Sequence, residues 1–208
     1  MGAWGVTARE SDYGLDTLTR IEMDYLKPID FKHFDVKGVM EFCRNHIIEG
    51  LRREHEPYVK NKERLQYYID ANLPYRYNTV IQLVAECLSE FSQKGVFVIL
   101  DYEAKKKMKI EEFIFTGSVL DELLEELYKM LDPTHDVYTS WFEEDTRQEW
   151  IAHMKMMCDS IVKLKSSASP KKPKKPAKAK INKASATTKI AKTPKETKKS
   201  KGGSVNEQ

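Results

Sequence analysis

Apolar side chains stop abruptly along this 208-residue chain, and that break limits how much of the chain can fold. From Ser166 to the last residue there is no aromatic side chain, and lysine, proline, alanine, serine and threonine dominate. Such a composition cannot bury enough apolar surface to offset the entropy of ordering the chain. We therefore expect one globular domain over residues 1–165, long enough for a single core, and a disordered tail over residues 166–208.

Charge divides at the same place. The tail holds 13 lysines, no arginine and two glutamates, whereas residues 1–165 hold 22 basic and 30 acidic side chains. The net charge of +3 thus combines a body near −8 with a tail near +11. Lysine is a point charge without paired donors, so the tail is expected to contact DNA or RNA phosphates without sequence preference. The lysines expected to make these contacts are Lys171, Lys172, Lys174, Lys175, Lys178, Lys180 and Lys183.

Two other roles for the tail stay open at this point. It could only solvate the protein, or it could fold back on the acidic body. Its mixture of lysine with proline, alanine, serine and threonine resembles the tails of linker histones and of some bacterial nucleoid proteins. That resemblance implies association with nucleic acid rather than recognition of a base sequence.

In the body, apolar residues recur at helical spacing. They predict about six helices, over roughly residues 12–26, 36–54, 57–74, 77–94, 118–131 and 146–165, with a short helix near 137–142. Pro74 is expected to end the third helix and Gly95 the fourth. Ser118 with Asp121 resembles the capping pair that begins a helix.

One segment carries a β pattern. Val96–Leu100 is short, apolar and rich in β-branched residues, and Met108–Phe115 predicts a second strand. The alternation slips at Glu111 and Glu112, which indicates a bulge or a register break. The expected fold class is therefore mainly α (α+β), a compact helical domain with a small β-hairpin.

Several side chains could carry chemistry, but none forms a recognisable catalytic or metal-binding set. Asp12 and Asp16 lie four residues apart on one helix face, and we expect helix capping and solvent contact rather than catalysis. Cys43 and His46 lack the further ligands that zinc or iron needs. No P-loop, dinucleotide-binding or serine-hydrolase motif is present. We predict no catalytic residue, no metal and no cofactor.

The three cysteines fall on apolar helix faces, far apart in sequence, which indicates free thiols in a reducing compartment. No apolar run approaches the length of a membrane span, and no secretory leader opens the chain. We expect a cytoplasmic protein without membrane contact.

Trp4, Trp141 and Trp150 predict a structural anchor. An indole near a chain end is either packed or exposed to a partner, and we expect Trp4 to dock near the other two and tie the ends of the body together. The opening Met-Gly-Ala-Trp-Gly, the following Ser-Asp-Tyr-Gly-Leu-Asp and the two spaced tryptophans resemble the bacterial family of domain of unknown function 4259. The resemblance implies a small bacterial cytosolic protein, sometimes in mobile-element settings, and supplies no catalytic residues.

These observations favour a non-enzymatic binding or regulatory protein. Its acidic body would bind a protein partner of basic character, and its tail would associate nonspecifically with DNA or RNA. Two alternatives remain. The first is a mobile-element anti-defence inhibitor that acts on a basic nucleic-acid-binding protein. The second is a metal-dependent enzyme that uses Asp12, Asp16 and the acidic run Glu143–Asp145.

Overall fold

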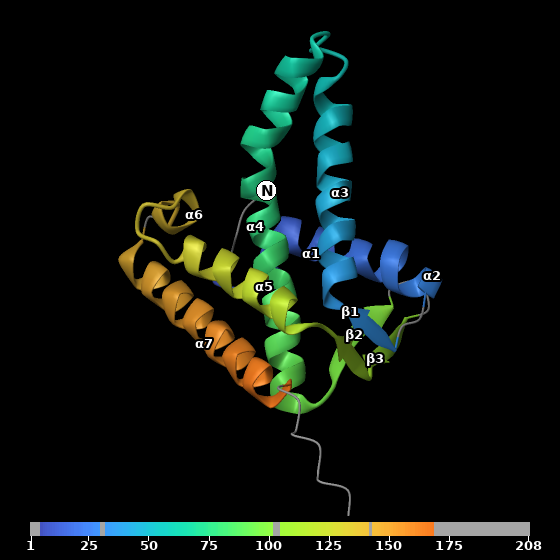
Figure 1. Ribbon diagram of the computed structural model, residues 1–208, viewed down its shortest axis with the longest axis vertical. Helices are drawn as coiled ribbons and strands as arrows, with labels where there is room; N and C mark the ends of the chain where they lie inside the picture. The colour runs from blue at the N-terminus through green and yellow to red at the C-terminus, as the bar shows by residue number, and fades with distance from the viewer. Residues whose placement is uncertain (1–4, 30–31, 102–104, 142, 169–208) are drawn as a thin grey trace, which may run out of the picture. The chain divides into compact units, whose positions relative to one another are not determined.

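Helices make up most of the structure, a computed structural model that describes residues 5–29, 32–101, 105–141 and 143–168 (Figure 1). The expected class, a mainly helical domain with a small hairpin, is confirmed. Trp4 and the tail lysines lie outside the described residues, so the disorder and the contacts expected there stay predictions. Within the described ranges, no helix is both long and apolar enough to cross a membrane.

The N-terminal segment turns through a short 3₁₀ helix, Ala8–Glu10, and enters α1, Asp12–Arg20. Ser11 is the N-cap, because its hydroxyl accepts a hydrogen bond from the Gly14 backbone N–H at 3.0 Å. A Cβ at position 14 would lie 1.8 Å from the Ala8 carbonyl oxygen, so only glycine allows this close approach. The helix continues through a π-helical stretch, Ile21–Leu26, and α2, Lys27–Ile29.

Helices α3, Val36–His55, and α4, Lys62–Lys94, form an antiparallel hairpin at the top of Figure 1. The expected end at Pro74 is wrong, because α4 continues through the proline for five further turns. Pro74 cannot donate to the Asp70 carbonyl, but it lies on the exposed side of α4, where water can satisfy that oxygen. Gly95 ends α4 with a φ of 67°, as expected for a left-handed cap.

The β segments form two small sheets where one hairpin was predicted. Strand β2, Phe97–Asp101, pairs antiparallel with β3, Lys106–Ile110. The next strand, β4, Glu112–Ile114, leaves that sheet and pairs in parallel with β1, His33–Asp35. The predicted register break at Glu111 is the point where the chain changes sheets. The sequence around β1 predicts a loop, and β1 becomes a strand because it pairs with β4.

Phe113 shows why the second sheet forms. Its ring stacks on Phe34 with centroids 4.6 Å apart and lies 4.6 Å from Phe91 and 6.1 Å from Phe97. The parallel pairing places Phe34 directly opposite Phe113, so burial of these rings accompanies the backbone pairing. The two small sheets thus close one end of the helical core.

Helices α5, Gly117–Met130, α6, Asp136–Thr139, and α7, Glu144–Ala168, complete the described domain. Thr116 caps α5 through a bond from the Val119 N–H at 3.3 Å, so the predicted Ser118–Asp121 capping pair is wrong. The C-terminal half of α4 lies at the centre, in contact with α3, α5, α7 and the N-terminal segment. Its side chains Val80, Ile81, Leu83, Val84, Ala85, Cys87 and Leu88 are fully buried.

Candidate functional site

A buried carboxylate on α4 holds the N-terminal segment in place. Glu86 has a side chain only 3% exposed, and its Oε1 accepts a hydrogen bond of 2.6 Å from the Ala8 N–H. Gln82 Nε2 donates to the same oxygen at 3.1 Å, and His153 Nε2 of α7 lies 3.1 Å from it. A carboxylate this deep requires such partners, because burying it alone would cost several kcal/mol.

The N-terminal segment follows α4 in a fixed register. Gln82 Nε2 also donates to the Val6 carbonyl at 2.9 Å, one turn of α4 before Glu86. Two residues of extended chain span nearly the same length as four residues of helix. Val6 can therefore bond Gln82 while Ala8 bonds Glu86, one helical turn further along α4. Trp150 Nε1 donates to Gln82 Oε1 at 3.4 Å, which links α7 to the same group of residues.

Arg9 extends this network to the surface. Its guanidinium lies 3.7 Å from Glu86 Oε2 and bonds Glu90 at 2.8 Å, and it stands over the Phe97 ring at 5.3 Å. Partial burial works against ionisation of Glu90, but hydrogen bonds from Arg9 and Lys94 hold its pKa below the ordinary value. The network therefore combines a buried anchor with a charged rim.

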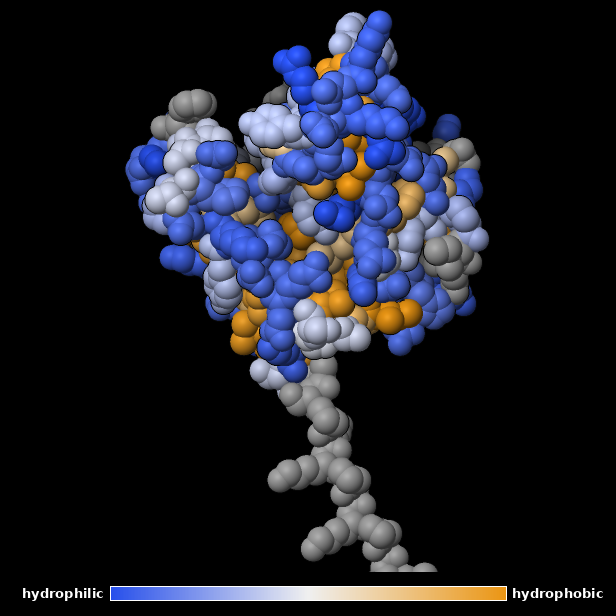
Figure 2. Space-filling view, turned by 45° about the horizontal axis from the view of Figure 1, so that its top comes forward, coloured by the Kyte–Doolittle hydropathy of each residue, from blue (hydrophilic) through white to orange (hydrophobic). Residues whose placement is uncertain are grey.

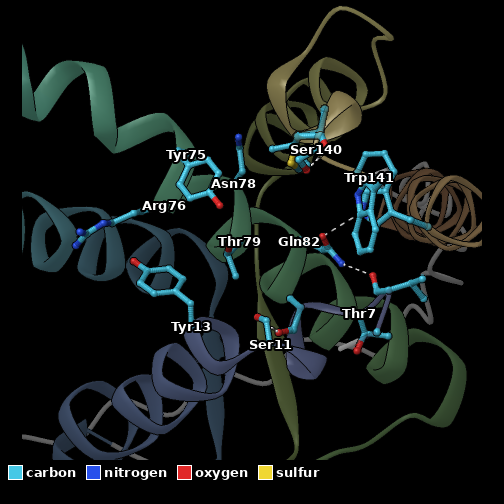
Figure 3. Close-up of a pocket in the computed structure, with 16 residues that line it drawn as sticks. Thr7, Ser11, Tyr13, Tyr75, Arg76, Asn78, Thr79, Gln82, Ser140 and Trp141 are labelled. Carbon is cyan, nitrogen blue, oxygen red and sulfur yellow. Dashed lines mark hydrogen bonds between the residues drawn. The ribbon is translucent and has the colours of Figure 1, made fainter. Parts of the chain in front are cut away.

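Beside Gln82 lies a cavity of about 340 Å³, drawn in Figure 3. Its described walls combine aromatic and small polar side chains, including Tyr13, Tyr75, Trp141, Asn78, Thr79 and Ser140. No histidine, cysteine, aspartate or glutamate is among the described lining residues. The described walls include the phenol groups of Tyr13 and Tyr75, and their mixture of aromatic rings with a few polar groups is typical of ligand-binding cavities.

The structure brings two of the three predicted anchor residues together. Trp141 and Trp150 have ring centroids 5.9 Å apart, and Tyr138 meets Trp150 edge-on at 6.1 Å. Trp150 is fully buried, whereas Trp141 is half-buried and its Nε1 finds no hydrogen-bond partner in the described structure. Trp4 lies outside the described residues, and its docking beside this pair stays a prediction.

The carboxylates of α1 are not drawn into one site. Asp12 is the first residue of α1 rather than its N-cap, which is Ser11, and an acid there still favours the positive end of the helix. Asp16 is exposed at the rim of a second hollow, which Cys43 and His46 also line. Among the residues that the structure describes, no three histidine, cysteine, aspartate or glutamate side chains are grouped to hold a metal ion.

The three cysteine thiols are in environments that make them unreactive. Cys43, Cys87 and Cys158 are free and buried, and burial raises the pKa of the first two to about 12 and that of Cys158 to about 11. The pKa of His46 beside Cys43 is lowered by burial and by Arg20 and Arg53, so it does not supply a positive partner for a thiolate. A cysteine–histidine nucleophile is therefore not formed here.

We predict slow thiol modification in the native protein. At pH 8 the three cysteines should react with a disulfide reagent at least about tenfold more slowly than after unfolding in urea, because the raised pKa values keep them protonated. The same shifts stabilise the fold in full below the unfolded thiol pKa of about 8.5, and this contribution is lost as pH rises toward the folded values. Absorbance of the released thiolate measures the rates, and rapid labelling of native protein would contradict the assignment.

One face of α5 forms an acidic stripe with an aromatic centre. Asp121, Glu125 and Tyr128 of α5 and Asp132 just beyond its end follow one another at spacings of four, three and four, and they line a shallow groove together with Leu124 and Lys129. Lysines already meet two of the three carboxylates, because Lys165 pairs with Asp121 and Lys129 lies 2.9 Å from Glu125. The Tyr128 side chain is 56% exposed, so its ring is open to a partner. Residues 117–168 hold 11 acidic and five basic side chains, so most of the body's net negative charge lies in this part.

Comparisons with protein families, with characterised proteins and with solved structures find no match. The resemblance to the family of domain of unknown function 4259 therefore stays a prediction.

Sequence reasoning missed the group Gln82, Glu86 and His153. A signal was present, because Gln82 and Glu86 interrupt an otherwise apolar stretch of helix at a spacing of four. Polar residues in such a position must find buried partners. The sequence could not identify those partners, since they lie 67 to 78 residues away.

Proposed function

We propose that the protein is a non-enzymatic binding protein, whose α5 stripe recognises a basic protein partner and whose lysine tail associates nonspecifically with DNA or RNA. The observation that carries the proposal is the uneven charge of the body. Residues 117–168 have a net charge of −6, against −8 for residues 1–165 as a whole. A surface of one sign attracts and orients an oppositely charged partner.

Tyr128 gives this surface a specific contact. Binding energy at protein interfaces is concentrated in a few aromatic and arginine side chains surrounded by polar ones. Tyr128 comes between Glu125 and Asp132 in the α5 groove, which the buried side chain of Leu124 also lines. A basic partner would place a cation on Asp132, compete with Lys129 and Lys165 for Glu125 and Asp121, and cover the ring.

The tail would act as a tether. Disordered lysines bind phosphate weakly and independently of sequence, and they raise the local concentration of the attached domain near nucleic acid. The body would then meet a partner that is bound to the same nucleic acid while the tail holds it nearby, rather than by diffusing freely through solution. This division of labour needs no catalytic step.

A labelled peptide rich in lysine and arginine tests the stripe. Tyr128→Ala combined with Glu125→Gln and Asp132→Asn should weaken its binding to the full chain about tenfold at low salt, because a ring and two carboxylates are removed. The matched control, Tyr58→Ala with Glu49→Gln and Glu63→Gln, removes the same groups from α3, α4 and their connection. Equal weakening by both variants, measured by fluorescence anisotropy, would contradict the proposal.

The tail is tested on duplex DNA of arbitrary sequence. Replacing the seven named lysines by glutamine in the full chain should make the log–log slope of affinity against salt about 6 units shallower. An unchanged slope would remove the tail from the proposed function and leave the α5 stripe untouched.

A further inference from the structure

Among the described residues, the three most exposed large hydrophobic side chains are tyrosines on the α3–α4 hairpin. Tyr58, in the connection between α3 and α4, is 84% exposed, and Tyr67 and Tyr75 on α4 are 78% and 69% exposed. Tyrosine rings left in water bring no stability to a fold, and they commonly mark contact surfaces. Figure 1 shows the hairpin rising away from the other elements, so these rings are open to a partner.

Unpaired cations lie close in sequence to Tyr58 and Tyr67. Arg52 and Arg53 end α3, and Lys60, Lys62 and Arg64 lie where α4 begins; all five are exposed. None of them forms an ion pair or a side-chain hydrogen bond with another described residue. This end of the molecule, at the top of Figure 2, has a mostly hydrophilic surface.

The acids of the same region do not cancel this charge. Glu54 is already bound by Arg76 through two hydrogen bonds of 3.2 and 2.9 Å. Residues 52–64 hold five basic and three acidic side chains, a net charge of +2 in a body whose net charge is −8. The body therefore does not repel phosphate uniformly, because residues 52–64 carry a net charge of +2 whereas residues 117–168 carry a net charge of −6.

We propose that the hairpin tip, residues 52–67, binds single-stranded nucleic acid, with its cations on the phosphates and Tyr58 and Tyr67 stacked on bases. The inference shares the nucleic-acid partner of the proposed function and adds a second contact on the body. Cations that follow the backbone together with exposed aromatic rings are the means by which proteins hold single strands without sequence preference. Duplex bases are already stacked, so the rings would contribute little there.

The spacing along α4 supports a strand rather than a folded partner. Arg64, Tyr67, Ala71 and Tyr75 succeed one another at spacings of three and four, so they share one exposed side. The two tyrosines are about 12 Å apart along the axis, from the helical rise of 1.5 Å per residue. A flexible strand can follow such a ridge, whereas protein hot spots lie in packed pockets ringed by other contacts.

The test measures binding of the full chain to fluorescein-labelled oligo(dT) of about 20 nucleotides, a length that exceeds ordinary single-strand site sizes. Tyr58→Ala with Tyr67→Ala should weaken this binding about tenfold and leave binding to a duplex of equal length nearly unchanged. Lys60→Gln, Lys62→Gln and Arg64→Gln together should make the salt slope about 2 units shallower on the single strand. Circular dichroism confirms that each variant keeps its helices.

Matched controls separate the tip from general charge and from the tail. Lys109→Gln, Lys155→Gln and Lys163→Gln remove three exposed cations from β3 and α7, and Met156→Ala removes an exposed large side chain from α7. If the tip variants match these controls, the inference is overturned, and the tail variant described above still decides the proposed function. Polyglutamate serves as a model of an acidic protein partner. If the tip variants lose binding to polyglutamate but keep binding to oligo(dT), the inference is overturned in favour of such a partner.

Discussion

Glu86→Ala is expected to lower the free energy of unfolding by about 3–5 kcal/mol, which is the cost of removing one member of a buried charged group. The substitution leaves the Ala8 N–H and the Gln82 amide without their acceptor. His153 and Arg9 lose the carboxylate they face. Because Ala8 is held by this bond, the N-terminal segment should loosen along with the core.

Urea unfolding followed by circular dichroism measures this effect. Glu86→Gln retains a carbonyl oxygen for the Ala8 N–H and should cost less than the alanine variant. Glu49→Ala, which changes an exposed residue of α3, should stay within about 0.5 kcal/mol of the parent protein. A Glu86→Ala protein as stable as that control would show that the buried network contributes nothing.

Trp150→Ala is the second large expected loss, about 3–5 kcal/mol, since truncation of a buried tryptophan leaves a cavity in the core. Trp150 is fully buried, packs against Tyr138 and Trp141, and donates to Gln82. The variant therefore removes apolar contact and one bond to the N-terminal anchor at once. Thermal unfolding and urea unfolding measure the total loss of stability, and both midpoints should fall.

Trp141→Ala serves as the matched comparison. Its ring is half-buried and its Nε1 has no partner within the described structure, so the cost should be clearly smaller than at position 150. Trp150→Phe should recover most of the lost stability because it refills much of the cavity. Equal losses at positions 141 and 150 would contradict this view of the pair.

The helices show how much of the fold the spacing of apolar residues can predict. Stripes such as Leu120, Leu123 and Leu127 predict α5 because one face of a helix must be apolar to meet a core. Pro74 shows the limit of this reasoning. A local rule ends the helix there, but packing on both sides of the proline keeps α4 continuous, since most helical stability in proteins comes from tertiary contacts.

The strands show a different limit. Val96–Leu100 is recognisable from its own residues, and the slip at Glu111 is visible in the alternation. The partner of the next strand is not, because β1 lies nearly 80 residues earlier and has no strong β pattern of its own. Pairing of Phe34 with Phe113 forms this sheet, and such a contact has no local signature.

For the candidate sites, too, the sequence shows which residue types are present but not where they lie on the surface. The sequence contains the acidic body, the lysine tail and the lack of catalytic motifs, because these depend only on residue type. It does not show that Tyr58 and Tyr67 are exposed at the hairpin tip or that the cations beside them in sequence are unpaired among the described residues. Surface position depends on which helix face the core occupies.

The amino-acid sequence by itself determined a mainly helical body and the point where apolar side chains end, since helical periodicity and composition are local properties. Only the tertiary structure decided that Glu86 fixes the N-terminal segment on α4 and that Trp141 meets Trp150. It also decided that the chain changes sheets after Ile110. Those features depend on residues distant in sequence, and their free energies arise only when burial removes water from both partners at once.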